Sequence, residues 1–251
     1  MKILTNITTS KRNNANNWRV KMPNHVTTKI NASKEVLLSM LNSDGDIDFE
    51  MIIPYPDSMK DTVGMGICMS AEKAAELVCN EPLNENPLIA SLEADNRKDI
   101  DVTKLDDDSF DQFVVMVINK KKTGYYHKMD FNREVWGTKW NAYDHDIDQI
   151  DNGFIKFDTA WSHPDEVLKA LSLKFPSEEI RVEYADEDTG SNCGYYTIIN
   201  GCITSKSIAP KWCDMSDGEK SEWTKFAFTL RYPNDDPKEF GYDESWVYCD
   251  E

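Results

Sequence analysis

Three tryptophans and a tyrosine fall within 26 residues of this 251-residue chain, in the stretches Trp136–Tyr143 and Phe154–Trp161. Aromatic rings bury large areas and fix the geometry of their neighbours, so a cluster this dense is typical of a packing centre. We therefore predict a core aromatic cluster made of Trp136, Trp140 and Trp161. An alternative stays open, in which these rings and Asn141 form an exposed platform that stacks a nucleobase.

The segment from Phe154 to Ile203 has the pattern of one strand–helix–strand–strand block. Phe154–Ala160 alternates as a strand does, and Ser162–Asp165 then provides a helix start that contains a proline. One face of the following helix is apolar, with Val167, Leu168, Leu171 and Phe175. Ile180–Tyr184 alternates again, and a polar turn leads into a further strand over Gly194–Ile203.

Upstream of this block, His25–Asn31 and Ile47–Ile53 have the β-branched content or alternation of strands. Ser33 is a good helix cap and precedes a short apolar stripe. Asp106–Asp108 starts another helix, because the helix dipole favours acids at this end. The body of this helix runs from Phe110 to Lys122.

The sequence predicts no regular secondary structure for two segments. Residues 80–106 form a long polar insertion, and Asp144–Asp148 is a carboxylate-rich loop. The alternating acids of this loop suggest a calcium loop, but the central glycine of such a loop is missing, so a solvated loop is the better interpretation.

The tail contains one more helix, with Trp223, Phe226 and Leu230 on one face, and an acidic stretch beyond Pro233. Together these elements predict one α+β domain, with an antiparallel sheet covered by helices on one face. We divide the chain into a basic polar arm at 1–22, the domain at 23–210 with its insertion at 80–106, and an acidic C-terminal extension at 211–251.

The formal charge of the chain is −17, and it is unevenly distributed. Residues 1–30 carry six basic side chains and no acidic one, so the remainder holds −23. Such a surface repels nucleic acid and attracts basic surfaces, through a field that salt weakens. Ordinary acidic solubility is one explanation. The other is a decoy that presents carboxylates where a DNA-binding partner expects phosphates.

The six cysteines and four histidines are scattered, without a C-x-x-C pair or the short ligand spacings of a zinc site. We expect free thiols, no metal and no cofactor. No apolar run is long enough for a membrane span or for the core of a signal peptide, so the chain is expected to be cytoplasmic.

Several segments together resemble one protein family. They are Pro23–Val26, Phe49–Pro56 (FEMIIPYP), Trp136–Ala142 (WGTKWNA), Phe157–Pro164 (FDTAWSHP) and Tyr184–Glu187 (YADE) followed by Gly194. In these segments, roughly from residue 23 to 205, the chain resembles the YubB-like (Api-like) ferredoxin-fold proteins of phages and conjugative plasmids. The resemblance implies a ferredoxin-like α+β sandwich and a mobile genetic element. It implies no reaction and no catalytic residue, because the family lacks an assigned activity.

We expect a binding protein rather than an enzyme. A phage or plasmid product meets host enzymes that grip DNA through Lys and Arg, and a surface with fixed carboxylates competes for such grooves. The prediction is an anti-defence inhibitor, of the anti-CRISPR or anti-restriction type, that binds a basic host nucleic-acid-handling complex through a DNA-mimicking surface without binding nucleic acid itself. The candidate interaction residues are Asp144, Asp146, Asp148, Glu183, Asp186, Glu187, Asp188, Trp246 and Tyr248.

The alternative is an enzyme that acts on a nucleotide or nucleic acid. The candidate acid–base groups are then Asp158 with His163, or His25 with Asp186 and Glu187, although nothing in the sequence brings either set within reach of each other. No catalytic residue is assigned.

Overall fold

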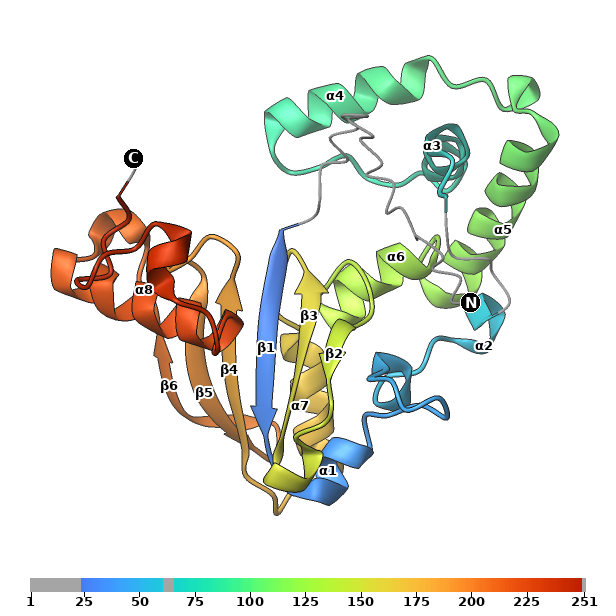
Figure 1. Ribbon diagram of the computed structural model, residues 1–251. Coiled ribbons are helices and arrows are strands. Elements are labelled where there is room, and N and C mark those ends of the chain that lie inside the picture. The colour runs from blue at the N-terminus through green and yellow to red at the C-terminus, as the bar shows by residue number, and fades with distance from the viewer. Residues whose placement is uncertain (1–23, 61–65, 250–251) are drawn as a thin grey trace, which may run out of the picture.

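A six-stranded antiparallel sheet forms the centre of the protein, in the order β2-β3-β1-β4-β5-β6 (Figure 1). The computed structural model describes residues 24–60 and 66–249. The predicted basic arm therefore lies outside the described residues. The strands are β1 (His25–Asn31), β2 (Tyr143–Asp146), β3 (Phe154–Ala160), β4 (Ile180–Asp186), β5 (Cys193–Ile199) and β6 (Cys202–Ile208). The predicted α+β fold with an antiparallel sheet is confirmed.

Strand β1 is central and pairs antiparallel with both β3 and β4. Helix α7 (Asp165–Lys174) connects β3 to β4, so these three elements form a split β-α-β unit around β1. Helix α7 and the short α1 (Lys34–Leu38) lie on one face of the sheet (Figure 1). The main core lies between them and the alternate residues of the three strands, such as Ile30, Phe157 and Val182.

The C-terminal extension covers part of the opposite face with α8 (Asp217–Arg231). Its start is fixed by a capping box, in which Ser216 and Glu219 bond each other's backbone amides. Ala227 and Leu230 of this helix pack against Ala185 and Cys193 of the sheet. Figure 1 shows α8 in front of β4 to β6, whereas α7 lies behind the sheet. The ferredoxin-like unit thus has its own helices on one face, and the extension adds a helix to the other.

A helical insertion lies between α1 and β2, beside the β2 edge of the sheet (Figure 1). It has a small core of its own, centred on Ala71, Ala75, Met116 and Tyr126. Its helices are α2 (Asp57–Lys60), α3 (Met69–Val78), α4 (Pro87–Lys98), α5 (Asp107–Thr123) and α6 (Lys128–Phe131). Across residues 24–60 and 66–249, no helix is both long and apolar enough to cross a membrane.

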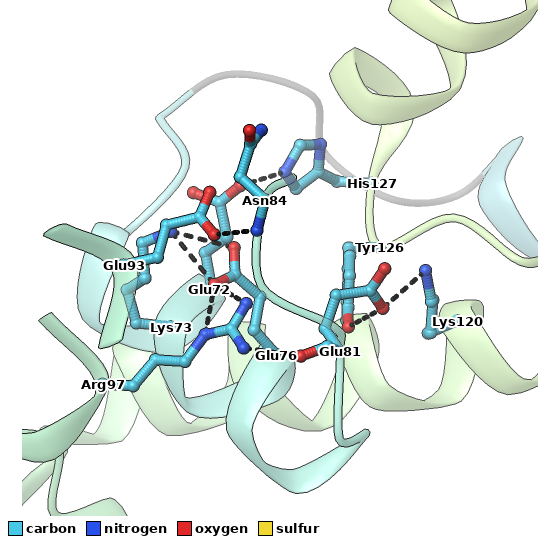
Figure 2. Close-up of polar contacts among 10 residues, drawn as sticks. All are labelled: Glu72, Lys73, Glu76, Glu81, Asn84, Glu93, Arg97, Lys120, Tyr126 and His127. Atoms are coloured by element: carbon cyan, nitrogen blue, oxygen red, sulfur yellow. Dashed lines mark hydrogen bonds and ion pairs between the residues drawn. The ribbon is translucent and has the colours of Figure 1, made fainter. Parts of the chain in front are cut away.

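Beside this core, charged side chains link the helices of the insertion (Figure 2). Arg97 reaches from α4 to Glu76 of α3 at 3.3 Å and donates to the Glu81 carbonyl at 2.6 Å. Lys120 of α5 binds the Glu81 carboxylate at 2.9 Å, and so does the Tyr126 hydroxyl. Helix α4 has no buried residue of its own, so Arg97 is its main attachment.

Two predicted strands are wrong in detail. Ile47–Ile53 is not a strand, because the Asp48 side chain caps a 3-10 turn over Phe49–Met51 by accepting from the Glu50 amide. The predicted strand over Gly194–Ile203 is instead the hairpin of β5 and β6. Asn200 and Gly201 turn the chain there with φ of 48° and 72°, which is the left-handed pair typical of a two-residue hairpin.

Two segments expected to be irregular are ordered. Residues 80–106 contain α4, which begins after Asn86 caps it and Pro87 supplies its first residue. Part of the predicted loop Asp144–Asp148 belongs to the edge strand β2, because Tyr143 and Asp146 pair with Asp158 and Lys156 of β3 around a bulge.

Replacing Arg97 with methionine is expected to detach α4 while the sheet stays folded. The substitution keeps the length of the side chain but removes charge-assisted hydrogen bonds, each worth about 1.5–3 kcal/mol. Hydrogen exchange of the α4 amides, followed by mass spectrometry, should become faster than in the wild type.

The matched control is Lys98→Met. Lys98 is the next residue along and pairs with Asp95 on the surface, where such pairs contribute little. Equal protection of α4 in both variants would show that Arg97 is not its attachment.

Candidate functional site

The Trp136 side chain is fully buried, as the sequence predicts. Its indole nitrogen donates to the Ile53 carbonyl at 3.0 Å. Its ring meets Phe49 edge-on with centroids 5.6 Å apart, and Tyr55 lies on another side at 4.8 Å. This tryptophan is therefore a core residue that joins the insertion to the sheet.

The other two tryptophans of the predicted core cluster are on the surface, and this part of the prediction is wrong. Trp140 is 39% exposed and Trp161 is 53% exposed. The physical reason is the turn at Gly137, whose φ of 77° redirects the chain out of the core. The Lys139 amide then bonds the Ala160 carbonyl at 3.4 Å, so the segment follows the end of β3 instead of entering the layers.

Cationic side chains lie against these exposed rings. The Lys139 ammonium lies 4.9 Å from the Trp140 ring centre and 4.7 Å from that of Trp161. The Arg133 guanidinium lies 5.8 Å from the Trp161 ring centre. These distances are within the range of a cation–π attraction, which favours a fixed orientation of the rings.

The aromatic surface continues along the end of the sheet. The Trp140 and Tyr143 rings are 6.3 Å apart, and the Tyr143 and His25 rings are 5.6 Å apart. The Tyr143 hydroxyl and His25 Nδ1 share a hydrogen bond of 2.8 Å. We call the set Trp161, Trp140, Tyr143 and His25 the aromatic row.

Trp161 adopts an unfavourable backbone conformation, with φ of 74°. A bulky residue in the left-handed region is an outlier, and its energetic cost is of order 1–3 kcal/mol. Hydrogen bonds on both sides enforce it. The Trp161 amide donates to the Asn24 carbonyl at 2.7 Å, Thr159 Oγ1 donates to the Ser162 carbonyl at 2.8 Å, and Ser162 Oγ donates to the Gly137 carbonyl.

His163 anchors the same loop from inside the protein. Its ring is buried, bonds Thr28 Oγ1 at 3.0 Å and the Tyr196 hydroxyl at 2.8 Å, and stacks on Tyr184 with ring centres 4.5 Å apart. Burial lowers the pKa of His163 from 6.5 to about 3. The imidazole is therefore neutral at physiological pH and is fully used in structural contacts. Asp158, its suggested acid–base partner, instead accepts a hydrogen bond from Thr27 at 2.7 Å.

Exposed carboxylates border the aromatic row. Burial raises the pKa of the Tyr143 hydroxyl above its ordinary value, and the nearby charges of Asp158, Asp144 and Glu187 raise it further. Asp144, Glu187 and the adjacent Asp188 are exposed, and none of them forms an ion pair with the described part of the chain. The structure thus brings acids from β2 and from the end of β4 to one end of the sheet.

The remaining acids of the predicted interface do not belong to that surface. Asp186 is buried, and its carboxylate accepts from Asn24, Asn192 and the Asp188 amide, so it shapes the turn after β4. Glu183 binds Lys29 at 3.2 Å, and both line, with Asp146, a groove of about 680 Å³ between the sheet and α8. Asp148 is exposed but lies beyond β2, at the opposite end of that strand from Asp144.

The two tail aromatics differ from each other. Trp246 packs on Phe228 of α8, with ring centres 5.6 Å apart, and is half-buried. Tyr248 is exposed and touches Tyr242. Both rings thus pack within the C-terminal extension and do not extend the aromatic row.

The sequence analysis did not assign Arg133, Lys139 and His25 to this site. They come from three separate segments, and only the adjacency of Lys139 to Trp140 is visible in the sequence. Among residues 24–60 and 66–249, no three His, Cys, Asp or Glu side chains gather in a way that would hold a metal ion.

Lowering the pH is expected to destabilise the protein through His163. The unfolded histidine takes up a proton below about pH 6.5, whereas the folded one stays neutral until about pH 3. The free energy of unfolding should therefore fall by up to about 1.4 kcal/mol per pH unit below pH 6.5 and should not depend on this group above it.

Urea unfolding between pH 7.5 and pH 5 measures this slope. His163→Gln lowers stability at every pH but should flatten the pH dependence. A slope equal to that of the wild type would contradict the assignment to His163.

Comparisons with known proteins bear on part of the chain. Residues 139–227 match the family model described as the ferredoxin-like domain in Api92-like protein. The match begins within the stretch Trp136–Tyr143, includes β2 to β6 and ends within α8. The Api-like resemblance of the sequence and its ferredoxin-like fold are thereby confirmed over this stretch.

The crystal structure of a protein api92 from Yersinia pseudotuberculosis aligns with 75% of this chain and 98% of its own, at 11% identity and a TM-score of 0.33. A likeness this weak supports no structural conclusion. No curated protein matches the sequence. The chain is therefore similar, in residues 139–227, to the ferredoxin-like domain of Api92-like proteins.

Proposed function

We propose that this protein is a binding module that inhibits a host nucleic-acid-handling complex, as an anti-defence protein of the anti-CRISPR or anti-restriction type. The observation that supports it is the surface at one end of the sheet. There Trp140 and Trp161 stand partly exposed, the latter on a strained backbone, beside carboxylates without ion-pair partners in the described residues.

The aromatic row has the properties of an interface anchor. Trp, Tyr and Arg are the residues in which the binding energy of protein interfaces concentrates. Lys139 and Arg133 hold the two indoles in place before binding, and a surface ordered in advance loses less entropy on association. We therefore assign the anchor role, which was predicted for Trp246 and Tyr248, to Trp140 and Trp161.

Charge selects the partner. The chain carries −17, and Asp144, Glu187 and Asp188 project from one end of the sheet. Strands lie about 4.8 Å apart, so acids on β2 and after β4 are separated by roughly 14 Å. This distance is comparable with the width of the DNA major groove, about 12 Å. Carboxylates at such spacing suit a basic surface that normally binds duplex phosphates.

The Api-like resemblance supports the anti-defence part of the proposal, because it points to phages and conjugative plasmids. A product of such an element benefits from occupying the DNA-binding groove of a host defence complex. The proposal places the protein in the host cytoplasm and gives it no catalytic step.

A second candidate is supported by the cations of the site. Exposed indoles beside Lys139 and Arg133 are also the features that stack bases and bind phosphates in single-stranded nucleic acid, as a nucleotide-processing enzyme would require. The acids around Tyr143 oppose this alternative, since they repel phosphates. The inhibitor is therefore the better-supported function.

Neutralising the acidic border is expected to abolish partner capture. The full-length chain is immobilised and exposed to a nuclease-treated host lysate at low and high salt. We expect the wild type to retain a nucleic-acid-binding complex that high salt and added duplex DNA both release. Asp144→Asn with Glu187→Gln and Asp188→Asn should lose most of it, and so should Trp140→Ala with Trp161→Ala.

The matched control removes the same charge elsewhere, in Glu35→Gln with Glu85→Gln and Asp99→Asn, which are exposed acids in other segments of the chain. Equal capture by the site and control variants would refute the proposed surface. Binding of single-stranded DNA by the isolated protein, lost in the tryptophan variant, would favour the second candidate.

A further inference from the structure

Helix α5 carries an apolar face that the described chain leaves partly exposed. Its inner side packs on α3, with Met116 and Asn119 buried. On the outer side, four large apolar side chains are each between 37% and 45% exposed, and they recur at helical spacing on one face. They are Phe110, Val114, Val115 and Ile118.

The charges at the two ends of this face are opposite. Asp107, Asp108 and Asp111 are exposed at the start of α5, and Lys121 and Lys122 are exposed at its end. None of these five forms an ion pair within residues 24–60 and 66–249. Such placement suits the helix dipole. It also makes the charges of two such faces complementary when the two copies of the helix pack antiparallel.

The position of α5 leaves this face accessible. Figure 1 shows α5 at the outer edge of the helical insertion, on the side remote from α8, with α3 on its inner side. The aromatic row lies at the end of the sheet, on other elements. The α5 face is therefore separate from the surface of the proposed function.

We propose that two copies of this chain associate through α5, packed antiparallel across a two-fold axis near Val114 and Val115. With the axis there, residue 107 of one copy faces residue 122 of the other, and residue 108 faces residue 121. Asp107 and Asp108 of each copy then face Lys122 and Lys121 of the other copy, and the two-fold axis makes this contact occur twice in the dimer. The apolar side chains lie between these charged ends.

The arrangement favours a second copy over an unrelated partner. A two-fold interface requires one patch that complements itself, and an acidic end, an apolar middle and a basic end satisfy that condition. Seventeen residues span about 25 Å, so the contact is at the small end for protein interfaces. The association is expected to be weak and concentration-dependent.

Charge reversal tests this interface. Sedimentation velocity of the full chain is measured over a concentration series. We expect the wild type to shift from monomer to dimer as the concentration rises. Asp107→Lys with Asp108→Lys should weaken self-association at least about tenfold, because four pairs turn repulsive. Lys121→Asp with Lys122→Asp should do the same.

The decisive step is to mix the two variants. One carries lysines at both ends of α5 and the other carries aspartates, so the mixture should form a heterodimer where neither variant self-associates. Circular dichroism checks that both remain folded, and Ile118→Lys provides a second disruption at the centre of the face. A wild type that stays monomeric, or a mixture that does not associate, would overturn the proposal. Trp140→Ala with Trp161→Ala should leave the dimer unchanged, which separates this interface from the proposed function.

Discussion

The buried indole of Trp136 joins the two halves of the molecule. Its nitrogen is bound to the Ile53 carbonyl, and its ring contacts Tyr55 and Phe131 of the insertion. On the other side it meets Phe49, which packs edge-on against Phe157 of the sheet at 5.7 Å. A continuous line of aromatic rings therefore runs from the insertion into the main core. Because aromatic pairs have preferred geometries, this line fixes where the chain leaves the core after Gly137.

The exit from the core at Gly137 determines the course of the next residues. The segment from Thr138 to Ala142 lies along the end of β3, so Trp140 faces the solvent beside Lys139. Trp161 meets the same lysine from the loop after β3, whose far end is held by the buried His163. A folded framework thus imposes a left-handed conformation on an exposed tryptophan. Strain at an exposed aromatic residue is more consistent with recognition than with packing.

Much of the fold could be predicted from local patterns, because the alternation in β1, β3 and β4 and the apolar stripes of α7 and α8 are strong signals. The failures have physical causes. Ile47–Ile53 has strand composition, but Asp48 competes for the backbone amide of Glu50 and starts a turn. Asn200 and Gly201 form a recognisable hairpin turn pair. The apolar residues on both sides of this pair make the whole stretch resemble a single strand.

The site was less accessible to sequence reasoning than the fold. The sequence shows three tryptophans close together. It does not show which of their rings lie in the core and which lie on the surface after the turn at Gly137. The acids were similarly divided by tertiary structure. The Asp186 carboxylate accepts a hydrogen bond in the turn after β4, and Glu183 forms an ion pair with Lys29. Asp144 and Glu187 instead remain exposed. The contacts of the folded chain, and not the local sequence, distinguish these roles.

The free energy of unfolding of Trp161→Gly tests most directly whether Trp161 is displayed at a conformational cost. Glycine adopts φ of 74° without strain, so the variant should stay within about 1 kcal/mol of the wild type or exceed it. Trp136→Ala, the internal reference, should lose about 3–5 kcal/mol because it empties the core. A loss of that size in Trp161→Gly would show that Trp161 is a packing residue and would contradict its role as a displayed anchor.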